Sequence, residues 1–524
     1  MEKAAPPFAI VGGWVFFLWT PRILMSAFSE IRALSRFRQV QLAALVLLLA
    51  GIGAIAFQIK LCVLDPDIWW HLKVGDWIID HFAVPHTGIL SRTAATRPWV
   101  AYSWGYEVLL SRAYAWFGLI GIGLYGTLLT LMVAYSVYWM LHRLSGQFWL
   151  ACVGAGIVCS AFLFNGMPRP FFFSITLFAI TLTLLLEANR GGHIQALYWL
   201  PLIFFLWANL HIQFIYGLFL VGLFVGVNLA QHAAAALKIV PDFLAAPTLP
   251  IARLILIGAA CVIATLVGPY SYHPYQVVYE YSKAKFTYSV IIELQPLSFR
   301  GYSHFAELFL TAAGFFAVGW RKKLDPFKLA LMTVASVIAY RTMRDAWFIC
   351  LPAAACIAEA CAPQQASEQE QPAFAETWLE KFGVAAAVAI LLAMIANGTD
   401  FTQRGLDRAI SSEYPVNAIN FLRRSPVQGP LYNALNWGGF LMWYMPEFPV
   451  AIDGRNDLYG DDLDRLFYNS QSAEKSYTTD PYLNEAGIVL LGSEMPLAKI
   501  LTVDSRFQLV YHDDIATAFA RRLP

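Results

Sequence analysis

Two aspartates stand where the first long apolar run ends, within the sequence DPDIWWHL at residues 65–72. Carboxylates this close together can share a divalent cation such as Mg²⁺ or Mn²⁺, or one of them can act as a general base. Both roles suit attack on a phosphate-activated sugar, because a cation neutralises the leaving phosphate and a carboxylate takes the acceptor's proton. Asp65 and Asp67 are therefore candidate catalytic residues and candidate metal ligands. The alternative is that Asp67 caps a helix that begins near Ile68.

Two other residues at the borders of apolar runs are candidates for substrate binding. His71 follows Asp67 by four positions, so both fall on one turn of a helix that starts near Ile68. The histidine is either a metal ligand or proton shuttle, or an interface residue hydrogen-bonded to a neighbour. Arg169 stands between two prolines. It suits bidentate phosphate binding, or else it anchors a helix end at the lipid headgroups.

Charged residues also mark two later loops. Arg341 and Arg344 repel one another unless an anion joins them, and either Asp345 or a substrate phosphate can be that anion. Glu293 is flanked by apolar residues, and it is either a second acid in a site or a partner for Arg300.

Two turns carry the remaining candidates. Asn209 and His211 lie between two apolar runs, where they either cap helix ends or line a cavity. Asp453, Gly454 and Arg455 follow a predicted strand. Glycine lets a backbone come close to a ligand, so the two charged side chains either bind acceptor hydroxyls or pair with each other to hold the turn.

The elements that position these residues are apolar helices. Hydrophobic residues make up 58% of the chain and charged residues only 14%, unlike a soluble protein. The net charge of +1 argues against a nucleic-acid partner. A membrane span needs about 20 apolar residues, so the recurring apolar runs predict a polytopic α-helical membrane protein with about eleven spans. The expected spans are 40–59, 119–141, 149–164, 171–187, 196–208, 213–230, 251–268, 304–320, 327–340, 346–361 and 382–398.

Positive charge orients these spans. Residues 1–39 include a basic amphipathic stretch from Arg22 to Arg38, and the sequence RKK follows the eighth predicted span at 321–323. Both fall on one side of the membrane under this count, and the positive-inside rule makes that side the cytoplasm. The transmembrane part then covers 40–398, with a first outside loop at 60–106. Because the number of spans is odd, residues 399–524 are expected on the extracytoplasmic side of the cell (inner) membrane.

The stretch 399–524 has a different pattern from the rest of the chain. Short apolar segments predict strands at 429–432, 449–452, 488–491 and 507–511, and helices lie near 415–424 and 461–470. This alternation predicts a small soluble α/β domain. The stretch contains no cysteine, so its fold needs no disulfide even in an oxidising compartment.

The first loop resembles that of bacterial membrane proteins related to the GT-C glycosyltransferases, which include protein mannosyltransferases, aminoarabinose transferases and oligosaccharyltransferase. The shared features are DPDIWWHL at 65–72, GDWI at 75–78, VP at 84–85, PW at 98–99, Trp104, WANLH at 207–211 and IDGR at 452–455. Two departures are Ile212 with Gln213, where a glycine is expected after His211, and RTMRD at 341–345 in place of a paired Arg-Asn.

This resemblance implies the GT-C fold with a soluble C-terminal domain. It implies a polyprenyl-phosphate sugar donor and an acidic catalytic motif in the first outside loop, with Asp67 or Asp65 as the catalytic residue. The function that follows is inverting sugar transfer to a lipid, glycan or protein acceptor. The alternatives are a transporter or lipid flippase, and a membrane assembly protein without catalytic activity.

Overall fold

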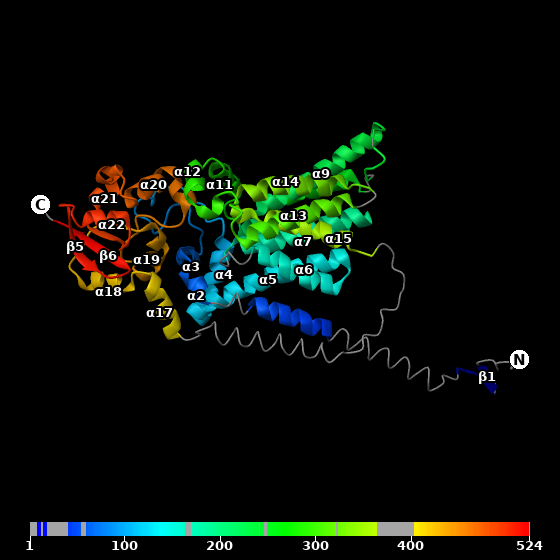
Figure 1. Cartoon of the computed structure of the whole chain (residues 1–524), viewed down its shortest axis with the longest axis horizontal. Helices are drawn as coiled ribbons and strands as arrows, with labels where there is room; N and C mark the ends of the chain where they lie inside the picture. The colour runs from blue at the N-terminus through cyan, green and yellow to red at the C-terminus, as the bar shows by residue number, and fades with distance from the viewer. Residues whose placement is uncertain are drawn as a thin grey trace.

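The computed structural model describes residues 8–11, 14–17, 40–53, 59–162, 169–239, 241–245, 249–320, 323–363 and 403–522. A bundle of apolar helices forms one half of the molecule, and residues 403–522, the C-terminal region, form the other half (Figure 1). The first loop, residues 60–106, lies between these two halves, together with the short helices α11 and α12 (Figure 1). Of the predicted site residues, Asp65, Asp67 and His71 belong to this middle layer.

The bundle consists of helices that coincide with the predicted apolar runs. They are Val40–Gly53, α5 (Leu119–Ser145), α6 (Phe148–Phe162), α7 (Phe171–Gly191), η1 (Gln195–Trp199) with α8 (Leu200–Leu210), α9 (Phe214–Ala236), α10 (Ile251–Thr265), α13 (Tyr302–Gly319), α14 (Pro326–Arg341) and α15 (Trp347–Ala360). Helices α5, α7 and α9 are each long and apolar enough to cross a membrane. The predicted span 382–398 and the basic stretch 22–38 lie outside the described residues, so the count of about eleven spans stays a prediction.

Small side chains allow the bundle helices to pack closely. Helix α15 is rich in alanine, almost all of its side chains are buried, and it packs against α5, α13 and α14. A Cβ added at Gly314 of α13 would lie 2.9 Å from the Cα of Ala353 in α15. Such close backbone approach favours helix association in a membrane, where the lipid removes the hydrophobic drive that operates in water.

Helices α2 (Ile59–Leu64), α3 (Pro66–His81) and α4 (Trp104–Phe117) frame the first loop. Asp65 caps α3, because its Oδ1 accepts the backbone N–H of Asp67 at 3.0 Å, and Pro66 takes the first helical position. The alternative prediction that Asp67 is the cap is therefore wrong by two residues. A Cβ at Gly75 would lie 2.1 Å from the carbonyl oxygen of Glu107, so α3 and α4 touch through their backbones.

The C-terminal region contains a four-stranded sheet in the order β3-β4-β6-β5. Strands β3 (Leu431–Asn433) and β4 (Ile488–Gly492) are parallel, and β6 (Ala516–Arg521) is antiparallel to β4 and to β5 (Phe507–His512). The other elements are α17 (Gln403–Glu413), α18 (Val416–Arg424), η4 (Leu435–Trp437), α19 (Gly438–Tyr444), α20 (Asn456–Gln471), η5 (Lys475–Thr479), α21 (Pro481–Glu485) and α22 (Pro496–Leu501). Strand β6 was not predicted.

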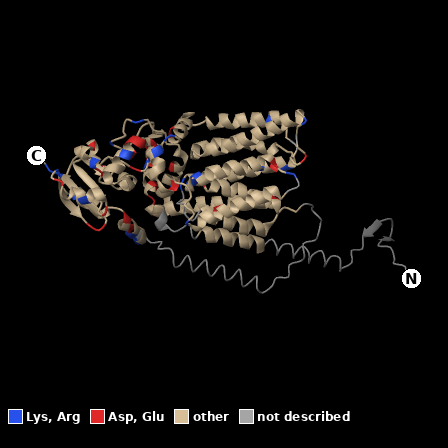
Figure 2. Ribbon diagram, turned by 45° about the horizontal axis from the view of Figure 1, so that its top comes forward, with Lys and Arg blue, Asp and Glu red and all other residues tan. Residues whose placement is uncertain are grey.

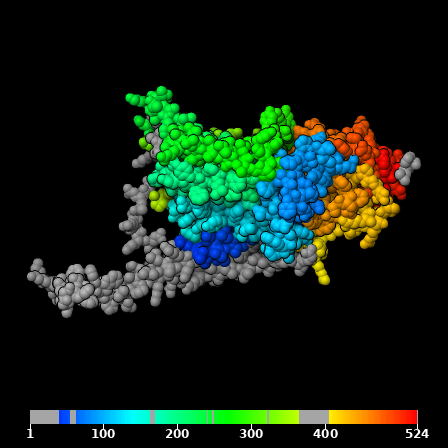
Figure 3. Space-filling view, turned by 180° about the vertical axis from the view of Figure 1, so that it is seen from behind, coloured from blue at the N-terminus to red at the C-terminus, as the bar shows by residue number. Residues whose placement is uncertain are grey.

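The first loop covers the seam between the bundle and the C-terminal region. In the space-filling view, its light-blue residues fill the space between the cyan and green bundle and the orange C-terminal region (Figure 3). The N–H of Arg92 donates to the carbonyl of Val450 at 2.8 Å, and Arg97 forms an ion pair of 2.6 Å with Asp462. On the other side of the loop, Trp104 Nε1 donates to Oδ1 of Asn209, the residue before the end of α8, at 3.2 Å, so the loop is bonded to both halves.

These contacts correct one strand prediction. Residues 449–452 form no strand, since Val450 makes only an isolated bridge with Ser91 of the first loop. The side chain of Asn433 bonds this segment on its other side, accepting from the N–H of Ala451 at 2.8 Å and donating to the carbonyl of Ile452 at 2.8 Å. A side chain therefore supplies the bonds that a neighbouring strand would have supplied.

A second loop also reaches the C-terminal region. It contains α11 (His273–Tyr281), α12 (Lys285–Val290) and η2 (Ile292–Leu294), and the short η3 (Met343–Asp345) lies beside it. Asp461 of α20 accepts the backbone N–H groups of Phe286 at 2.9 Å and Thr287 at 3.2 Å. This carboxylate therefore satisfies free donors at the start of α12. At the other end of the chain, β1 (Phe8–Val11) and β2 (Trp14–Phe17) form an antiparallel pair.

Candidate functional site

Arg169 lies among acidic side chains from two distant loops. Its Nε and Nη2 donate to Oδ2 and Oδ1 of Asp65, each at 2.8 Å. Its Nη1 lies 3.1 Å from Oδ2 of Asp67 and 3.6 Å from Oε1 of Glu293. The fold thus brings together residues that the sequence analysis selected separately, at the start of α3, just before α7 and in η2. We call these residues, with Arg344, the charged cluster.

The two aspartates of the charged cluster differ in exposure. The side chain of Asp65 is 3% exposed and that of Asp67 is 21% exposed. Both oxygens of Asp65 accept from Arg169, and one of them also caps α3. Asp65 therefore supports the cluster, and Asp67 is the carboxylate that solvent or a substrate can reach.

Trp70 fixes the second oxygen of Asp67. Its indole Nε1 donates to Oδ1 of Asp67 at 3.0 Å, one turn further along α3. Burial raises the pKa of Asp67, and the positive charge of Arg169 and the bond from Trp70 oppose this rise. This tryptophan was not a candidate in the sequence analysis, although its position three residues after Asp67 places the two side chains on one face of the helix.

Arg344 extends the charged cluster through Glu293. Its Nη2 bonds to Oε1 of Glu293, the same oxygen that faces Arg169. Burial alone would raise the pKa of Glu293, but Arg344 and Arg169 together hold it below its usual value. The expected partner Arg300 is therefore replaced by two arginines, and the carboxylate is ionised between them.

Asp345 does not join the two arginines of its own loop. It accepts from Thr342 at 2.8 Å, from Tyr216 at 2.9 Å and from Gln213 at 3.3 Å. Arg341 lies over the ring of Tyr288, 5.6 Å from its centre. The interpretation of Asp345 as the shared anion of the pair is therefore wrong, because Glu293 takes this place beside Arg344.

The side chain of His71 bonds to Glu107 of α4. Its Nδ1 lies 3.1 Å from Oε1 of that carboxyl, and both side chains are buried. Burial lowers the pKa of His71 and raises the pKa of Glu107, so a neutral hydrogen bond is favoured over an ion pair. This matches the alternative of a histidine bonded to a neighbour.

Asn209 and His211 bind other parts of the bundle. The amide of Asn209 donates to the carbonyls of Phe205 at 2.8 Å and Val267 at 2.9 Å, so it satisfies helix-end oxygens. The Nδ1 of His211 lies 2.8 Å from Oγ of Ser174. Burial, together with the charge of Arg344, lowers the pKa of His211 to about 3.

The turn at 453–455 reaches the charged cluster through its backbone. The side chains of Asp453 and Arg455 are both 0% exposed and pair at 2.8 Å, which matches the alternative of internal pairing. Between them, a Cβ at Gly454 would lie 2.1 Å from Oδ1 of Asp67. Asp457, two residues after this pair, accepts from Trp99 Nε1 at 3.0 Å, and it was not a candidate in the sequence analysis.

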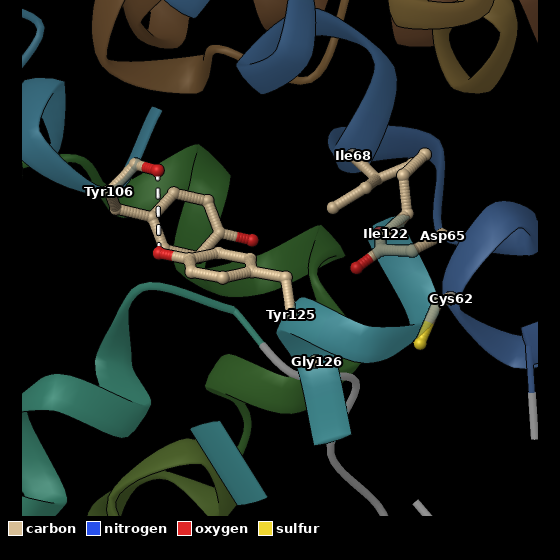
Figure 4. A pocket seen from close by; sticks show the side chains of 7 residues that line it. All are labelled: Cys62, Asp65, Ile68, Tyr106, Ile122, Tyr125 and Gly126. Atoms are coloured by element: carbon tan, nitrogen blue, oxygen red, sulfur yellow. Dashed lines mark hydrogen bonds between the residues drawn. The ribbon is translucent and has the colours of Figure 1, made fainter. Parts of the chain in front are cut away.

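A narrow crevice also reaches Asp65. It is lined by Cys62, Asp65, Ile68, Tyr106, Ile122, Tyr125 and Gly126. The phenol of Tyr125 donates to the carbonyl of Tyr106 at 3.4 Å across its floor (Figure 4). The crevice lies between the first loop and α5, and Asp65 is its one charged lining residue.

The geometry of the charged cluster does not fit the expected divalent cation. The guanidinium of Arg169 already stands between Asp65 and Asp67, where a shared metal ion would have to bind. Among the described residues, no three His, Cys, Asp or Glu side chains come together as a metal-binding group. A cation at this place would have to displace Arg169, so Mg²⁺ or Mn²⁺ binding stays a prediction without a step assigned to it.

Chemically, the charged cluster combines a reachable carboxylate with two guanidinium groups. A carboxylate can accept a proton from a nucleophile, and arginine binds phosphate oxygens in a bidentate manner. Figure 2 shows that acidic and basic residues gather between the bundle and the C-terminal region and near the far helix ends, while the helices are otherwise mostly uncharged.

Comparison with solved structures identifies the fold. A crystal structure of the oligosaccharyltransferase from Archaeoglobus fulgidus, tethered to an acceptor peptide containing the NVT sequon, matches with a TM-score of 0.50 and 12% identity over 92% of this chain and 74% of that chain. A crystal structure of ArnT from Cupriavidus metallidurans bound to undecaprenyl phosphate matches with a TM-score of 0.45 and 14% identity over 89% and 96% of the two chains.

Sequence comparisons add nothing to this result. No protein-family model matches the chain, and no curated protein sequence matches it. The fold match and the long apolar helices together indicate an integral membrane protein. They also confirm the resemblance that the first loop predicted: this chain has a GT-C-like fold.

Proposed function

We propose that this protein is a membrane glycosyltransferase that moves a sugar from a polyprenyl-phosphate-linked donor to a lipid, glycan or protein acceptor. The observation that carries the proposal is the position of Asp67, a partly exposed carboxylate beside Arg169 and near Arg344, where the bundle meets the C-terminal region. The GT-C-like fold supports it, because the matched oligosaccharyltransferase was crystallised with an acceptor peptide.

The proposed reaction is a single displacement at the anomeric carbon. Asp67 accepts the proton of the acceptor nucleophile as that atom attacks the carbon. The bond from this carbon to the phosphate oxygen breaks, and the lipid phosphate leaves with the electron pair, so the configuration inverts. Asp65 takes no proton in this scheme, because both of its oxygens are bonded to Arg169.

The two arginines are suited to bind the leaving phosphate. Arg344 and Glu293 have side chains that are 30% and 43% exposed, so their pair is open to exchange. A phosphate that displaces Glu293 would gain two guanidinium partners already held near each other, with little reorganisation during the reaction. Glu293 thus keeps the arginines in place until the donor binds.

We further propose that the C-terminal region lies outside the cell (inner) membrane and the N-terminus lies in the cytoplasm. The charged cluster then faces the compartment in which lipid-linked sugars are used. A transporter would need polar groups along a path through the bilayer. In the described spans, Lys328 and Glu359 lie near helix ends, and Glu307, in the sixth position of α13, is the one charged residue set deeper. A single buried carboxylate marks no continuous polar path, which supports an enzyme instead.

The test compares Asp67→Asn with wild-type protein, full-length and reconstituted in lipid nanodiscs. Each is incubated with a panel of radiolabelled polyprenyl-phosphate hexoses and pentoses, and loss of sugar from the lipid is measured. Removing a general base costs about 10²–10⁴-fold in rate, so we expect at least a 100-fold loss. The amide keeps an oxygen that can accept from Trp70, so the fold should be retained.

A matched control is Asp76→Asn on the same helix. Asp76 lies nine residues after Asp67 on α3, where it accepts from Ser111 Oγ of α4 at 2.6 Å. We expect this variant to transfer sugar at nearly the wild-type rate. Equal rates for Asp67→Asn and wild type would remove Asp67 from the reaction.

A further inference from the structure

The turn formed by Asp453, Gly454 and Arg455 lies directly against the start of α3. A Cβ added at Gly454 would lie 2.1 Å from Oδ1 of Asp67 and 3.3 Å from Nε1 of Trp70. The φ angle of Gly454 is outside the left-handed region, so glycine is required here by space and not by backbone conformation. The backbone of the C-terminal region therefore touches the carboxylate itself.

The turn is held firmly within the C-terminal region. The backbone N–H and Nε of Arg455 donate to Oδ1 of Asp453 at 3.0 and 2.8 Å, and its Nη2 donates to Oδ2 at 2.8 Å. Tyr459 donates to the same Oδ2 at 2.5 Å. A fully buried, multiply bonded ion pair of this kind resists distortion, because breaking it leaves an uncompensated buried charge.

The same arginine also bonds to the first loop. Its Nη2 donates to the carbonyl of Ile89 at 3.0 Å, and its guanidinium lies 4.7 Å from the ring centre of Trp99. The turn is thus fixed from the C-terminal region on one side and from the first loop on the other.

A second pair of glycines extends this close packing. A Cβ at Gly438 would lie 2.0 Å from the carbonyl of Ile452, and one at Gly439 would lie 2.6 Å from the carbonyl of Pro66. The first residues of α19 therefore fit between the segment leading into the turn and the first residue of α3. Three backbone segments meet without intervening side chains beside Asp67.

We infer that the turn at 453–455 is a positioning element, which restricts the side chain of Asp67 to the orientation that faces Arg169 and the substrate. The inference rests on the proposed function and deepens it. With Oδ1 covered by Gly454 and bonded to Trp70, the second oxygen remains for Arg169 and for the proton of an acceptor. Asp67 is then competent only while the C-terminal region is docked.

Gly454→Ala in the full-length protein tests this inference. The added methyl group must displace the turn or the carboxylate, and a displacement of about 1 Å at a reacting group costs about 100-fold in rate. We expect kcat to fall by about that factor while the KM for the lipid donor changes little. Gly492→Ala is the control in the same region, since its Cβ would lie 3.3 Å from the flexible side chain of Met495 and 3.9 Å, an ordinary contact distance, from the carbonyl oxygen of Ile515. It should keep wild-type kinetics.

Two further variants separate positioning from general damage. In the Asp67→Asn background, Gly454→Ala should lower the rate no further, because the carboxylate it positions is absent. Tyr459→Phe removes one bond to Asp453 while Arg455 still holds that carboxylate, so it should lower kcat by a smaller factor and lower the Tm only by the loss of that one bond. If Gly454→Ala does not fold, Tyr459→Phe still decides: a wild-type kcat in that variant would overturn the inference.

A measurement that does not depend on enzymatic activity separates this inference from the proposed function. In Asp67→Cys protein that also carries Cys361→Ser, Gly454→Ala should raise the rate of thiol modification by N-ethylmaleimide several-fold, whereas Gly492→Ala should not. A faster modification together with no sugar transfer by wild-type protein would sink the proposed function and leave the contact standing. An unchanged modification rate with a wild-type kcat would sink the inference.

Discussion

Arg169 is the residue on which the charged cluster depends, because its guanidinium pairs with Asp65, Asp67 and Glu293 at once. Lysine has the same charge but presents a single ammonium group, which cannot reproduce the bidentate contact with Asp65. Without that contact, two carboxylates near each other repel, and Asp67 loses its orientation. The role of Arg169 is therefore geometric as much as electrostatic.

We expect Arg169→Lys to reduce sugar transfer by about tenfold or more and to lower the Tm, since hydrogen bonds to charged groups contribute about 1.5–3 kcal/mol each. Arg143→Lys is the matched control. Arg143 forms a similar bidentate pair with Glu187, at 2.7 and 2.8 Å, at the other end of α7. The assignment fails if both lysine variants transfer sugar equally well.

Asp457 provides a test through pH. Burial raises its pKa to about 6, against the bond from Trp99 and the charge of Arg455. Because the pKa in the folded state lies above the unfolded value near 4, the folded state binds more protons between these values. Stability contributed by this group is therefore lost as the pH rises from about 4 to about 6.

We expect the wild-type Tm to fall relative to that of Asp457→Asn as the pH rises through this window, and to run parallel to it above about 7. The asparagine can still accept from Trp99 but carries no charge. Thermal melts of both proteins between pH 4 and 8 measure the difference. Parallel curves across the whole range would mean that Asp457 is not a buried acid in the folded protein.

At the scale of elements, the contact of α3 with α4 decides whether the charged cluster can form. The backbone approach at Gly75 leaves no room for a Cβ, whereas a Cβ at Gly222 in α9 would meet nothing within 4 Å. Alanine favours helices over glycine by about 1 kcal/mol, so the two substitutions have the same intrinsic effect. Any difference in Tm between the two alanine variants should therefore come from the packing around each glycine.

We expect Gly75→Ala to lower the Tm and the yield of monodisperse protein, and Gly222→Ala to leave both unchanged or slightly raised. The measurement is thermal unfolding in detergent, with tryptophan fluorescence as the signal. If Gly75→Ala is as stable as Gly222→Ala, then α3 and α4 are not held together at this point.

Elements were predicted from the sequence wherever one pattern dominates. Apolar runs were long enough to mark every bundle helix in the described residues, and the resemblance of the first loop predicted the fold. Strand β6 was missed because its sequence ATAFAR mixes small and charged residues without a clear alternation. The segment at 449–452 was mistaken for a strand because its apolar residues are buried by the first loop instead.

The charged cluster could be predicted only in part. Asp65, Asp67, Arg169 and Arg344 were selected by their position at the borders of apolar runs, and Glu293 was selected because apolar residues flank it within a loop. Their pairing was not predictable, since Arg169 and Asp65 are 104 positions apart and no local sequence pattern indicates which distant residues come into contact. The sequence also could not show that Arg455 is buried and structural, because an arginine in a turn is usually exposed.

At the scale of the whole molecule, the proposed orientation makes a direct prediction for labelling. Phe82 in the first loop and Val503 in the C-terminal region are 95% and 86% exposed, and Leu237 at the end of α9 is 69% exposed. Single cysteines at these positions require a background without Cys361, which is the exposed native cysteine.

In intact cells, a membrane-impermeant maleimide should label Phe82→Cys and Val503→Cys in the Cys361→Ser background. Leu237→Cys should react only after permeabilisation, because it lies at the opposite end of the bundle under the proposed topology. Labelling of Phe82→Cys and Val503→Cys on opposite sides would contradict a shared chamber for the first loop and the C-terminal region.

The bond from Arg455 to the carbonyl of Ile89 joins residues that are 366 positions apart in the chain. A ribosome adds about 5–20 residues per second, so the early partner waits tens of seconds for the late one during synthesis. In that interval the nascent protein can insert its spans while its acidic loop is still uncovered. A chain whose synthesis stops early would reach the membrane but lack the turn that orients Asp67. Under the inference above, such incomplete copies would not transfer sugar.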